Sequence, residues 1–189
     1  MTRVYVPTTL AGLTRAQHRG RLDDAAGVVN AAGGGDGAGG GESAGGVLAA
    51  HAVTGAVREW YVEGNQEELE YAALIEAAES SLRLLAIEPG VPRRRVVLAI
   101  DVPEALISPG GEHRSSVRVS GPVALSQVVS LHVDEVESES IIAAAVEAQP
   151  GAAAGDEDAQ FQLDEAEACD LLWYDISEID DLIGETRES

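Results

Sequence analysis

A His–Asp pair is the most suggestive grouping of residues that could carry acid–base or metal chemistry in this chain. His132 and Asp134 are two residues apart in an apolar run, so a strand would place both side chains on one face. Asp101 ends a second apolar run, and His51 precedes Thr54 at an expected strand-to-helix junction. A histidine beside carboxylates can act as a general base or bind a metal ion. His51, Asp101, His132 and Asp134 are therefore candidate binding residues.

The same four residues also fit an ordinary structural role, which we favour. The chain has four His, and none falls in an HxH, HExxH or HxxxH spacing. A metal site would need a further ligand that the sequence does not place. We therefore predict no metal site, no cofactor and no catalytic residue, and expect these polar groups to be hydrogen-bonded at the ends of strands.

Nucleophilic catalysis has little support in the sequence. Cys169 has no neighbouring His and lies among acidic residues, which disfavours a reactive thiolate. Ser126 and Ser130 lack the Gly-x-Ser-x-Gly turn of serine hydrolases. All 12 basic residues are Arg, so no Lys can form a Schiff base or clamp a phosphate. We expect the protein to be a binding protein rather than an enzyme.

Arg58, Trp60 and Tyr61 form the clearest candidate contact surface. The chain has two Trp, four Tyr and one Phe, so two adjacent aromatic residues are unusual here. Trp, Tyr and Arg dominate binding hot spots. Neighbouring residues on a helix point about 100° apart, so at most one of the two rings is expected to be fully buried. A binding surface is one interpretation, and the other is that one ring packs inside while one lies under a loop.

Negative charge is concentrated in the last third of the chain. The formal net charge is −21, and residues 134–189 carry 18 of the 33 acidic residues but one of the 12 Arg. A chain of this charge is not expected to bind nucleic-acid phosphates directly. Apolar residues such as Phe161 and Trp173 interleave with the acids, which favours an ordered segment with an acidic outer face. The alternative is a partly disordered acidic arm that recognises a basic partner.

Arg93–Arg95 is the one basic cluster, and two uses are open. It could hold a small anion, or it could compensate acidic residues of the same fold, which we favour. The single Cys excludes an intrachain disulfide. No apolar run reaches the roughly 18 residues of a membrane span, and Met1–Pro7 lacks the layout of a secretory signal. We therefore expect a soluble, cytoplasmic protein with no membrane contact.

The hydrophobic pattern predicts an α+β fold in one compact domain spanning residues 1–189. We expect a mixed or antiparallel sheet of about five to six strands packed by a long helix over 65–87 and by shorter helices. The helix is signalled by Asn65 and Glu68 in a capping-box spacing and by an apolar stripe that begins at Tyr71. The expected strands are 3–6, 47–53, 96–102, 117–120, 128–133 and 171–174.

Three segments are predicted to lie outside the regular elements. Residues 27–46 contain ten Gly and four Ala and are expected to form a flexible loop insertion. Residues 149–158 read as a weak linker, and 184–189 as a disordered C-terminus.

Several stretches resemble an uncharacterised actinobacterial protein family, a domain of unknown function. The resemblance extends from residue 3 to about 183 without the Gly-rich loop, and rests on the segments RVYVP (3–7), HAVT (51–54), REWY (58–61), EELEYAA (67–73), SLRLL (81–85), PRRRVV (92–97), HVD (132–134), DAQF (158–161) and LLWY (171–174). It implies a small cytoplasmic actinobacterial protein. It implies no activity, cofactor or site residue.

Taken together, these features lead us to expect a non-enzymatic protein-interaction or regulatory module with an acidic C-terminal third. Its partner would be an unknown protein or a second copy of the chain. An enzyme or small-ligand-binding protein with a His/Asp pocket is the alternative, and mimicry of nucleic acid by the acidic face is a third.

Overall fold

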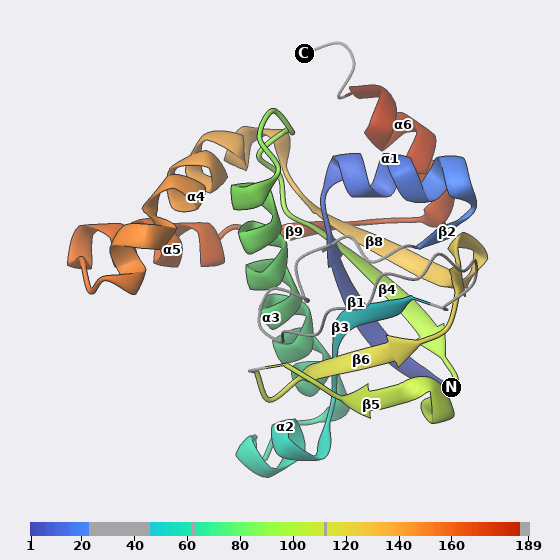
Figure 1. Ribbon diagram of the computed structural model, residues 1–189. Helices are drawn as coiled ribbons and strands as arrows, with labels where there is room; N and C mark the ends of the chain where they lie inside the picture. The colour runs from blue at the N-terminus through green and yellow to red at the C-terminus, as the bar shows by residue number, and fades with distance from the viewer. Residues whose placement is uncertain (23–45, 62, 112, 186–189) are drawn as a thin grey trace, which may run out of the picture.

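A seven-stranded antiparallel sheet forms the centre of the molecule, with helices on both of its faces (Figure 1). The structure is a computed structural model that describes residues 1–22, 46–61, 63–111 and 113–185. The strand order is β5-β6-β3-β1-β4-β8-β9, and every neighbouring pair is antiparallel. The fold is α+β, as expected, and its sheet is antiparallel.

The elements have the following bounds. The strands are β1 Thr2–Thr8, β2 Arg21–Leu22, β3 Val47–Ala52, β4 Val96–Val102, β5 Ile107–Pro109, β6 Ser116–Ser120, β7 Val123–Ala124, β8 Val128–Asp134 and β9 Leu171–Tyr174. The helices are α1 Leu10–Arg19, α2 Gly55–Trp60, α3 Gln66–Ile87, α4 Glu139–Ala153, α5 Glu157–Glu167 and α6 Ile179–Glu185.

The strand count exceeds the expected five to six because very short strands leave little trace in a hydrophobic pattern. β5 has three residues and carries Pro109 at the edge of the sheet, where a missing N–H is tolerated. β2 and β7 have two residues each and form a separate small sheet. The six longer strands were predicted, within a few residues at their ends.

Pro7 lies inside β1, whereas the sequence suggested that it ends this strand. β1 pairs with β4 along its whole length, but it pairs with β3 only at Val4 and Tyr5. At Pro7 one side of β1 is therefore open, and the missing N–H can face that side without breaking a ladder hydrogen bond.

One face of the sheet packs against α1 and α6. Leu10 and Leu13 of α1 and Leu182 of α6 join the inward side chains of the strands in the main buried cluster. Thr9 caps α1 through the Gly12 N–H, and Gly20 ends it with a left-handed φ of 67°.

The opposite face packs against α3. The predicted capping box at its start is present, since the Asn65 side chain accepts the Glu68 N–H and the Glu68 carboxylate accepts the Asn65 N–H. The face of α3 that covers the sheet centres on Ala73, Ala77 and Ala78. Tyr71 was expected in this buried stripe but is 59% exposed. The buried stripe is displaced from Tyr71 because small alanines let the helix approach the sheet closely.

Helices α4 and α5 form a hairpin that extends from α3 to one side of the sheet (Figure 1). Its core joins Leu82 and Leu85 of α3 to Ile142 and Val146 of α4 and Ala166 of α5. The expected weak linker over 149–158 is helical for most of its length, because α4 continues through Pro150 to Ala153 and α5 begins at Glu157. The acidic third is thus ordered as far as residue 185.

Two further expectations lie partly outside the described residues. Of the Gly-rich segment, only Gly46 is described; of 184–189, Gly184 and Glu185 belong to α6 and the rest lie outside. Among the described residues, no helix combines the length and apolar character needed to cross a membrane.

Candidate functional site

His51 lies at the centre of a buried hydrogen-bond network between β3 and α3. Its Nδ1 is 2.6 Å from Oγ of Ser115, and its Nε2 is 2.9 Å from Oγ of Ser80. Ser115 also donates its hydroxyl proton to Glu76 of α3. His51 is 4% exposed and Ser115 is fully buried, whereas Ser80 is half-buried. The network therefore runs from the sheet outward to the flank of α3.

The direction of each hydrogen bond follows from the chemistry of its partners. A carboxylate only accepts, so the Ser115 proton points to Glu76 and the Ser115 oxygen accepts from His51. The proton of the neutral imidazole is then on Nδ1, and Nε2 is the acceptor for the Ser80 hydroxyl. The result is one chain of donors from Ser80 through His51 and Ser115 to Glu76.

Burial keeps His51 neutral. The pKa of His51 is lowered to about 4, mainly by burial. The nearby carboxylate of Glu76 acts in the opposite direction and raises the pKa in part. Electrostatic interactions with His113 and Arg83 lower the pKa of His51 further. The His113 ring centre is 5.9 Å from that of His51, and Nε2 of His113 is 3.0 Å from the Arg83 guanidinium.

Asp101 is engaged with Arg3 on the neighbouring strand. The two residues are register partners of β4 and β1, and the Arg3 guanidinium donates to both carboxylate oxygens at 2.6 and 3.1 Å. This hydrogen bond is the main cause that lowers the pKa of Asp101. Arg58 and Asp101 line a common pocket of about 360 Å³, together with Gln66 and Glu70. The structure thus brings together these two of the predicted residues.

His132 and Asp134 do share one face of β8, as their spacing predicted, but they do not act on each other. The buried side chains of Leu131 and Val133 point to the other face. His132 contacts Ser130 at 3.3 Å, and burial is the main cause that lowers its pKa. Asp134 is fully buried and takes a salt bridge from Arg95 at 2.7 Å.

A single pocket of His51, Asp101, His132 and Asp134, which was the alternative to the favoured structural role, is not formed. His51 belongs to a cross-strand row that runs through Tyr5 and Ala99 to Ser130 of β8. Three strand spacings separate its backbone from β8, which is roughly 14 Å. Hydrogen-bond reach between His51 and the His132–Asp134 pair is therefore excluded.

Trp60 and Tyr61 are both largely exposed, at 61% and 45%. The Arg114 guanidinium stacks over the Trp60 ring at 3.8 Å, and Arg58 donates to Gln66 at 3.0 Å. Neither ring enters the core, because the short helix α2 buries Val57 instead. Arg58, Trp60, Tyr61 and Arg114 constitute an accessible surface that we call the Arg/Trp patch.

Arg93–Arg95 serves internal charge compensation, the interpretation favoured by sequence. Arg95 contacts both carboxylate oxygens of Asp134, and the Arg93 N–H donates to the Glu139 carboxylate at 2.9 Å. Arg94 and Arg95 are each 3% exposed. Their guanidinium groups are therefore poorly placed to hold an anion from solution.

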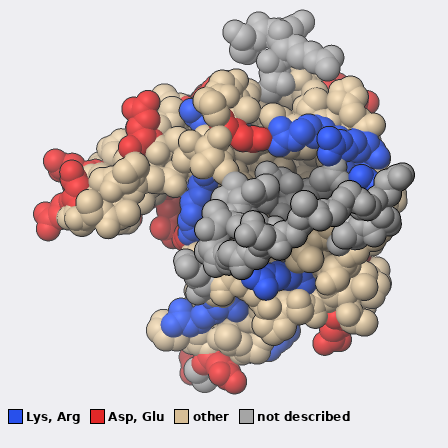
Figure 2. Space-filling view, viewed as in Figure 1, with Lys and Arg blue, Asp and Glu red and all other residues tan. Residues whose placement is uncertain are grey.

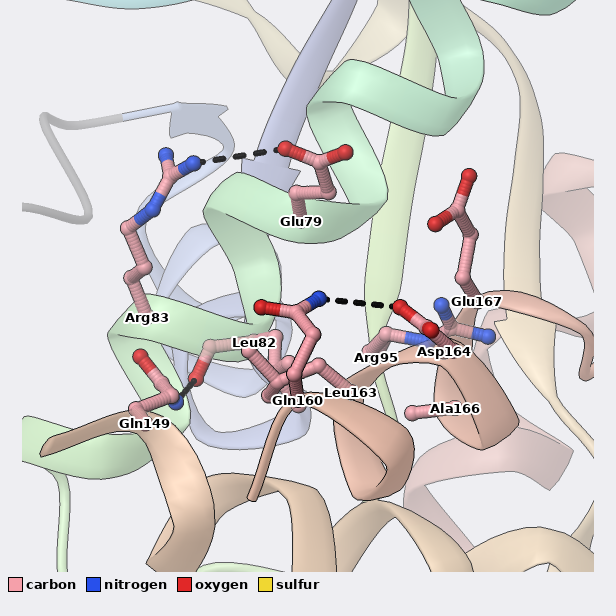
Figure 3. A pocket seen from close by; sticks show the side chains of 10 residues that line it. All are labelled: Glu79, Leu82, Arg83, Arg95, Gln149, Gln160, Leu163, Asp164, Ala166 and Glu167. Atoms are coloured by element: carbon pink, nitrogen blue, oxygen red, sulfur yellow. Dashed lines mark hydrogen bonds and ion pairs between the residues drawn. The ribbon is translucent and has the colours of Figure 1, made fainter. Parts of the chain in front are cut away.

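A crevice of about 210 Å³ lies between α3 and the α4–α5 hairpin (Figure 3). Its lining includes three acidic residues, Glu79, Asp164 and Glu167, and two arginines, Arg83 and Arg95. Glu79 pairs with Arg83 at 3.4 Å, four residues on along α3, and burial raises the pKa of Glu79. Glu167 makes no hydrogen bond or ion pair with any other described residue. None of the seven predicted binding residues lines this crevice.

Acidic side chains gather on the α4–α5 hairpin, at the end of the molecule away from α2 (Figure 2). Residues 134–185 contain no Lys, Arg or His. Phe161 of α5 lies among these acids and is 59% exposed. Within the described part of the chain, no group of three or more His, Cys, Asp and Glu side chains is arranged to hold a metal ion.

Sequence reasoning missed Glu76, Ser80, Ser115 and the crevice. Ser80 and Ser115 are 29 and 64 residues from His51, and neither falls in a recognisable motif. Glu76 and Ser80 do share a face of a predicted helix, at i,i+4, but nothing in the chain indicates that β3 passes beneath it.

Comparison with known proteins places the chain in a family. The sequence profile of a family described as "Family of unknown function (DUF6912)" matches residues 36–183. No curated protein and no solved structure matches the chain significantly. The matched residues include most of the sheet, α3, and the α4–α5 hairpin with its crevice. The chain therefore belongs to DUF6912, a family of unknown function.

Proposed function

We propose that this protein acts by binding another protein, and that its acidic α4–α5 hairpin receives a basic segment of that partner. The observation that carries the proposal is the crevice beside α3, in which three carboxylates line a space of about 210 Å³. A Lys or Arg side chain matches such a space in charge and shape.

The electrostatics of the crevice favour a cation from outside. Burial raises the pKa of Glu79, which means that its negative charge is unfavourably solvated. Glu167 has no hydrogen-bond or ion-pair partner among the described residues. The nearby guanidinium of Arg95 is occupied by Asp134 and by the Cys169 carbonyl. A cationic side chain of a partner would stabilise the charge of the Glu167 carboxylate, which no described side chain pairs, and would add to the Arg83 contact of Glu79.

Phe161 supplies an apolar contact at the edge of this crevice. It follows Gln160 and precedes Asp164 by three residues on α5, and both of those residues line the crevice. Neighbours at i,i+3 lie on adjoining parts of a helix surface. An exposed aromatic ring flanked by acids suits a segment that alternates basic and apolar residues.

The Arg/Trp patch at α2 is a second accessible surface and has the opposite charge. Its composition of Arg, Trp and Tyr is that of binding hot spots. We propose that it adds a further contact, either to the same partner or to a second copy of the chain. The absence of Lys, with Arg in every basic position, supports an origin in a GC-rich actinobacterium, where we expect the protein to work in the cytoplasm.

Capture from an extract of the source organism tests the proposal. The immobilised wild-type chain is compared with Glu167→Gln and Phe161→Ala, and with Asp181→Asn as a matched control on α6, which removes one charge away from the crevice. We expect one basic protein to be captured in near-stoichiometric amount. Each crevice variant should reduce its recovery about tenfold or more, while Asp181→Asn should leave it unchanged. Recovery should also fall as salt rises.

Two outcomes would contradict the proposal. One is that no protein, including a second copy of this chain, is recovered in stoichiometric amount. The other is that the recovered partner binds Glu167→Gln and Phe161→Ala as tightly as it binds the wild type. Because both substituted side chains are exposed, loss of folding does not explain a weaker capture.

A further inference from the structure

The hydrogen-bond chain at His51 has the layout of an activated hydroxyl. Ser80 donates to an imidazole nitrogen, and the other nitrogen of that ring is held by Ser115 and, through it, by Glu76. A nucleophile beside a base that a third group orients is the shared arrangement of enzymes that use serine as nucleophile. It does not depend on sequence order or on the fold.

Ser80 and Glu76 are the half-buried members of the hydrogen-bond chain, on the flank of α3, whereas His51 and Ser115 are buried. The chain offers a second Ser–His contact for comparison, between Ser130 and His132. That contact is longer, at 3.3 Å, and Ser130 is 4% exposed. Of these two pairs, only Ser80–His51 combines a short contact, an oriented imidazole and a hydroxyl on a residue that is not fully buried.

A positive charge lies beside the oxygen that would attack. The Arg83 guanidinium donates a hydrogen bond to Oγ of Ser80 at 3.2 Å. Attack on a carbonyl group turns its oxygen into an anion close to the attacking atom, and a fixed donor there lowers the barrier. Arg83 is held in place by Glu79 and His113.

We propose that Ser80 is a nucleophile that is acylated by small esters, with His51 as its base and Arg83 stabilising the oxyanion. Oγ of Ser80 attacks the ester carbonyl carbon while its proton passes to Nε2 of His51. The carbon–oxygen bond to the alcohol then breaks, and the alcohol leaves with that proton. Water repeats the sequence on the acyl-serine, which releases a carboxylic acid and restores both residues. This activity is independent of the proposed binding function.

The neutral state of His51 is compatible with a role as general base. Because His51 is a weak base, we expect the acylation of Ser80 to be slow. A pKa of about 4 leaves Nε2 of His51 unprotonated at neutral pH. A base whose pKa lies well below the working pH takes up a proton less effectively. Covalent labelling, which accumulates over time, is therefore a better first measurement than turnover.

A fluorophosphonate probe and a short-chain p-nitrophenyl ester test the proposal on the full chain. We expect mass spectrometry to locate the phosphonate adduct on Ser80, and Ser80→Ala to remove both the adduct and the ester hydrolysis. Ser130→Ala is the matched control and should react as the wild type does. His51→Gln should slow labelling by about 100-fold, the usual contribution of a general base.

Glu76 and Ser115 are positioning residues, and a pH profile separates their role from a purely structural one. The Glu76 carboxylate raises the pKa of His51, so Glu76→Gln should move the acid limb of the labelling profile to lower pH. It should also slow labelling by about tenfold, with an unchanged melting temperature. A structural effect would lower the rate equally at every pH. This variant keeps the test decisive if His51→Gln does not fold.

The proposal is overturned if prolonged incubation of the folded protein leaves Ser80 unmodified. It is also overturned if Ser80 is labelled equally fast in the wild type, in Glu76→Gln and in a folded His51→Gln. The imidazole would then not activate the hydroxyl.

Discussion

The guanidinium of Arg95 and the carboxylate of Asp134 form a buried ion pair across β4 and β8, with 2.7 Å between Nη2 of Arg95 and Oδ1 of Asp134. The Arg95 N–H also donates to this carboxylate at 2.6 Å. Asp134 is the first residue of the acidic third (residues 134–189). The pair therefore links the start of that third to β4. Both carboxylate oxygens of Asp134 already accept hydrogen bonds from Arg95, so Asp134 is poorly placed to act as a ligand.

Breaking this pair should destabilise the protein strongly. Arg95→Met leaves a fully buried carboxylate without its counter-ion, and we expect the free energy of unfolding to fall by about 3–5 kcal/mol. Urea denaturation measures the loss. The double variant Arg95→Met/Asp134→Leu should recover most of it, because no buried charge then remains. A double variant no more stable than the single one would contradict this account.

His51 should make stability depend on pH. The pKa of His51 is about 4 in the folded protein and about 6.5 in the unfolded chain. Between these values the unfolded chain binds the proton more tightly, so stability is fully present above pH 6.5 and is lost as pH falls toward 4. The loss amounts to about 3 kcal/mol.

Denaturation at pH 7, 5.5 and 4 compares the wild type with His51→Gln, which keeps an amide for the Ser80 and Ser115 contacts. The variant should show a shallower decline, since its side chain does not titrate. Equal declines would mean that His51 is not held in its neutral form.

Gly20 and Gly55 should respond oppositely to alanine. Neither glycine has another atom within 4 Å of an added Cβ, so crowding plays no part. Gly20 has a left-handed φ of 67°, and Gly20→Ala should cost about 1 kcal/mol in backbone strain. Gly55 begins α2 without a positive φ, and Gly55→Ala should be neutral or stabilising by up to about 1 kcal/mol. Thermal melts of both variants measure the two effects, and a loss of stability at Gly20 alone is the result expected from backbone strain.

The capping box of α3 should contribute measurably although it is exposed. Asn65→Ala removes the acceptor of the Glu68 N–H and should lower the free energy of unfolding by about 1 kcal/mol. Asn65→Ser is the control, because serine caps nearly as well as asparagine. If both variants lose the same stability, the side-chain cap is not the cause.

Local signals predicted most of the elements. The caps at Thr9, Thr54 and Asn65 and the stop at Gly20 each depend on residues within four positions, so they can be read from the chain. The misses have a common cause in packing. Pro150 stays helical within a hairpin that is packed on α3, and Tyr71 is exposed because the sheet meets the alanine face of that helix.

Candidate residues were harder to interpret, because chemistry depends on partners that are distant in sequence. The spacing of His132 and Asp134 correctly placed both on one face of β8, but it could not reveal that Asp134 forms a buried ion pair with Arg95. His51 was selected for its residue type and for its position before Thr54 at an expected strand-to-helix junction. Its partners Ser80 and Ser115 are brought to it by α3 and by the segment before β6, which no local pattern describes.

The sequence by itself determined the α+β class, the long capped helix and the concentration of negative charge after residue 133. These follow from local preferences and from counting charges. Only the tertiary structure decided which polar groups meet. Strand order separates His51 from His132 by three strand spacings, and the packing of α5 against α4 and α3 creates the acidic crevice. Both depend on which surfaces are buried against each other, a property of the whole chain that no short stretch encodes.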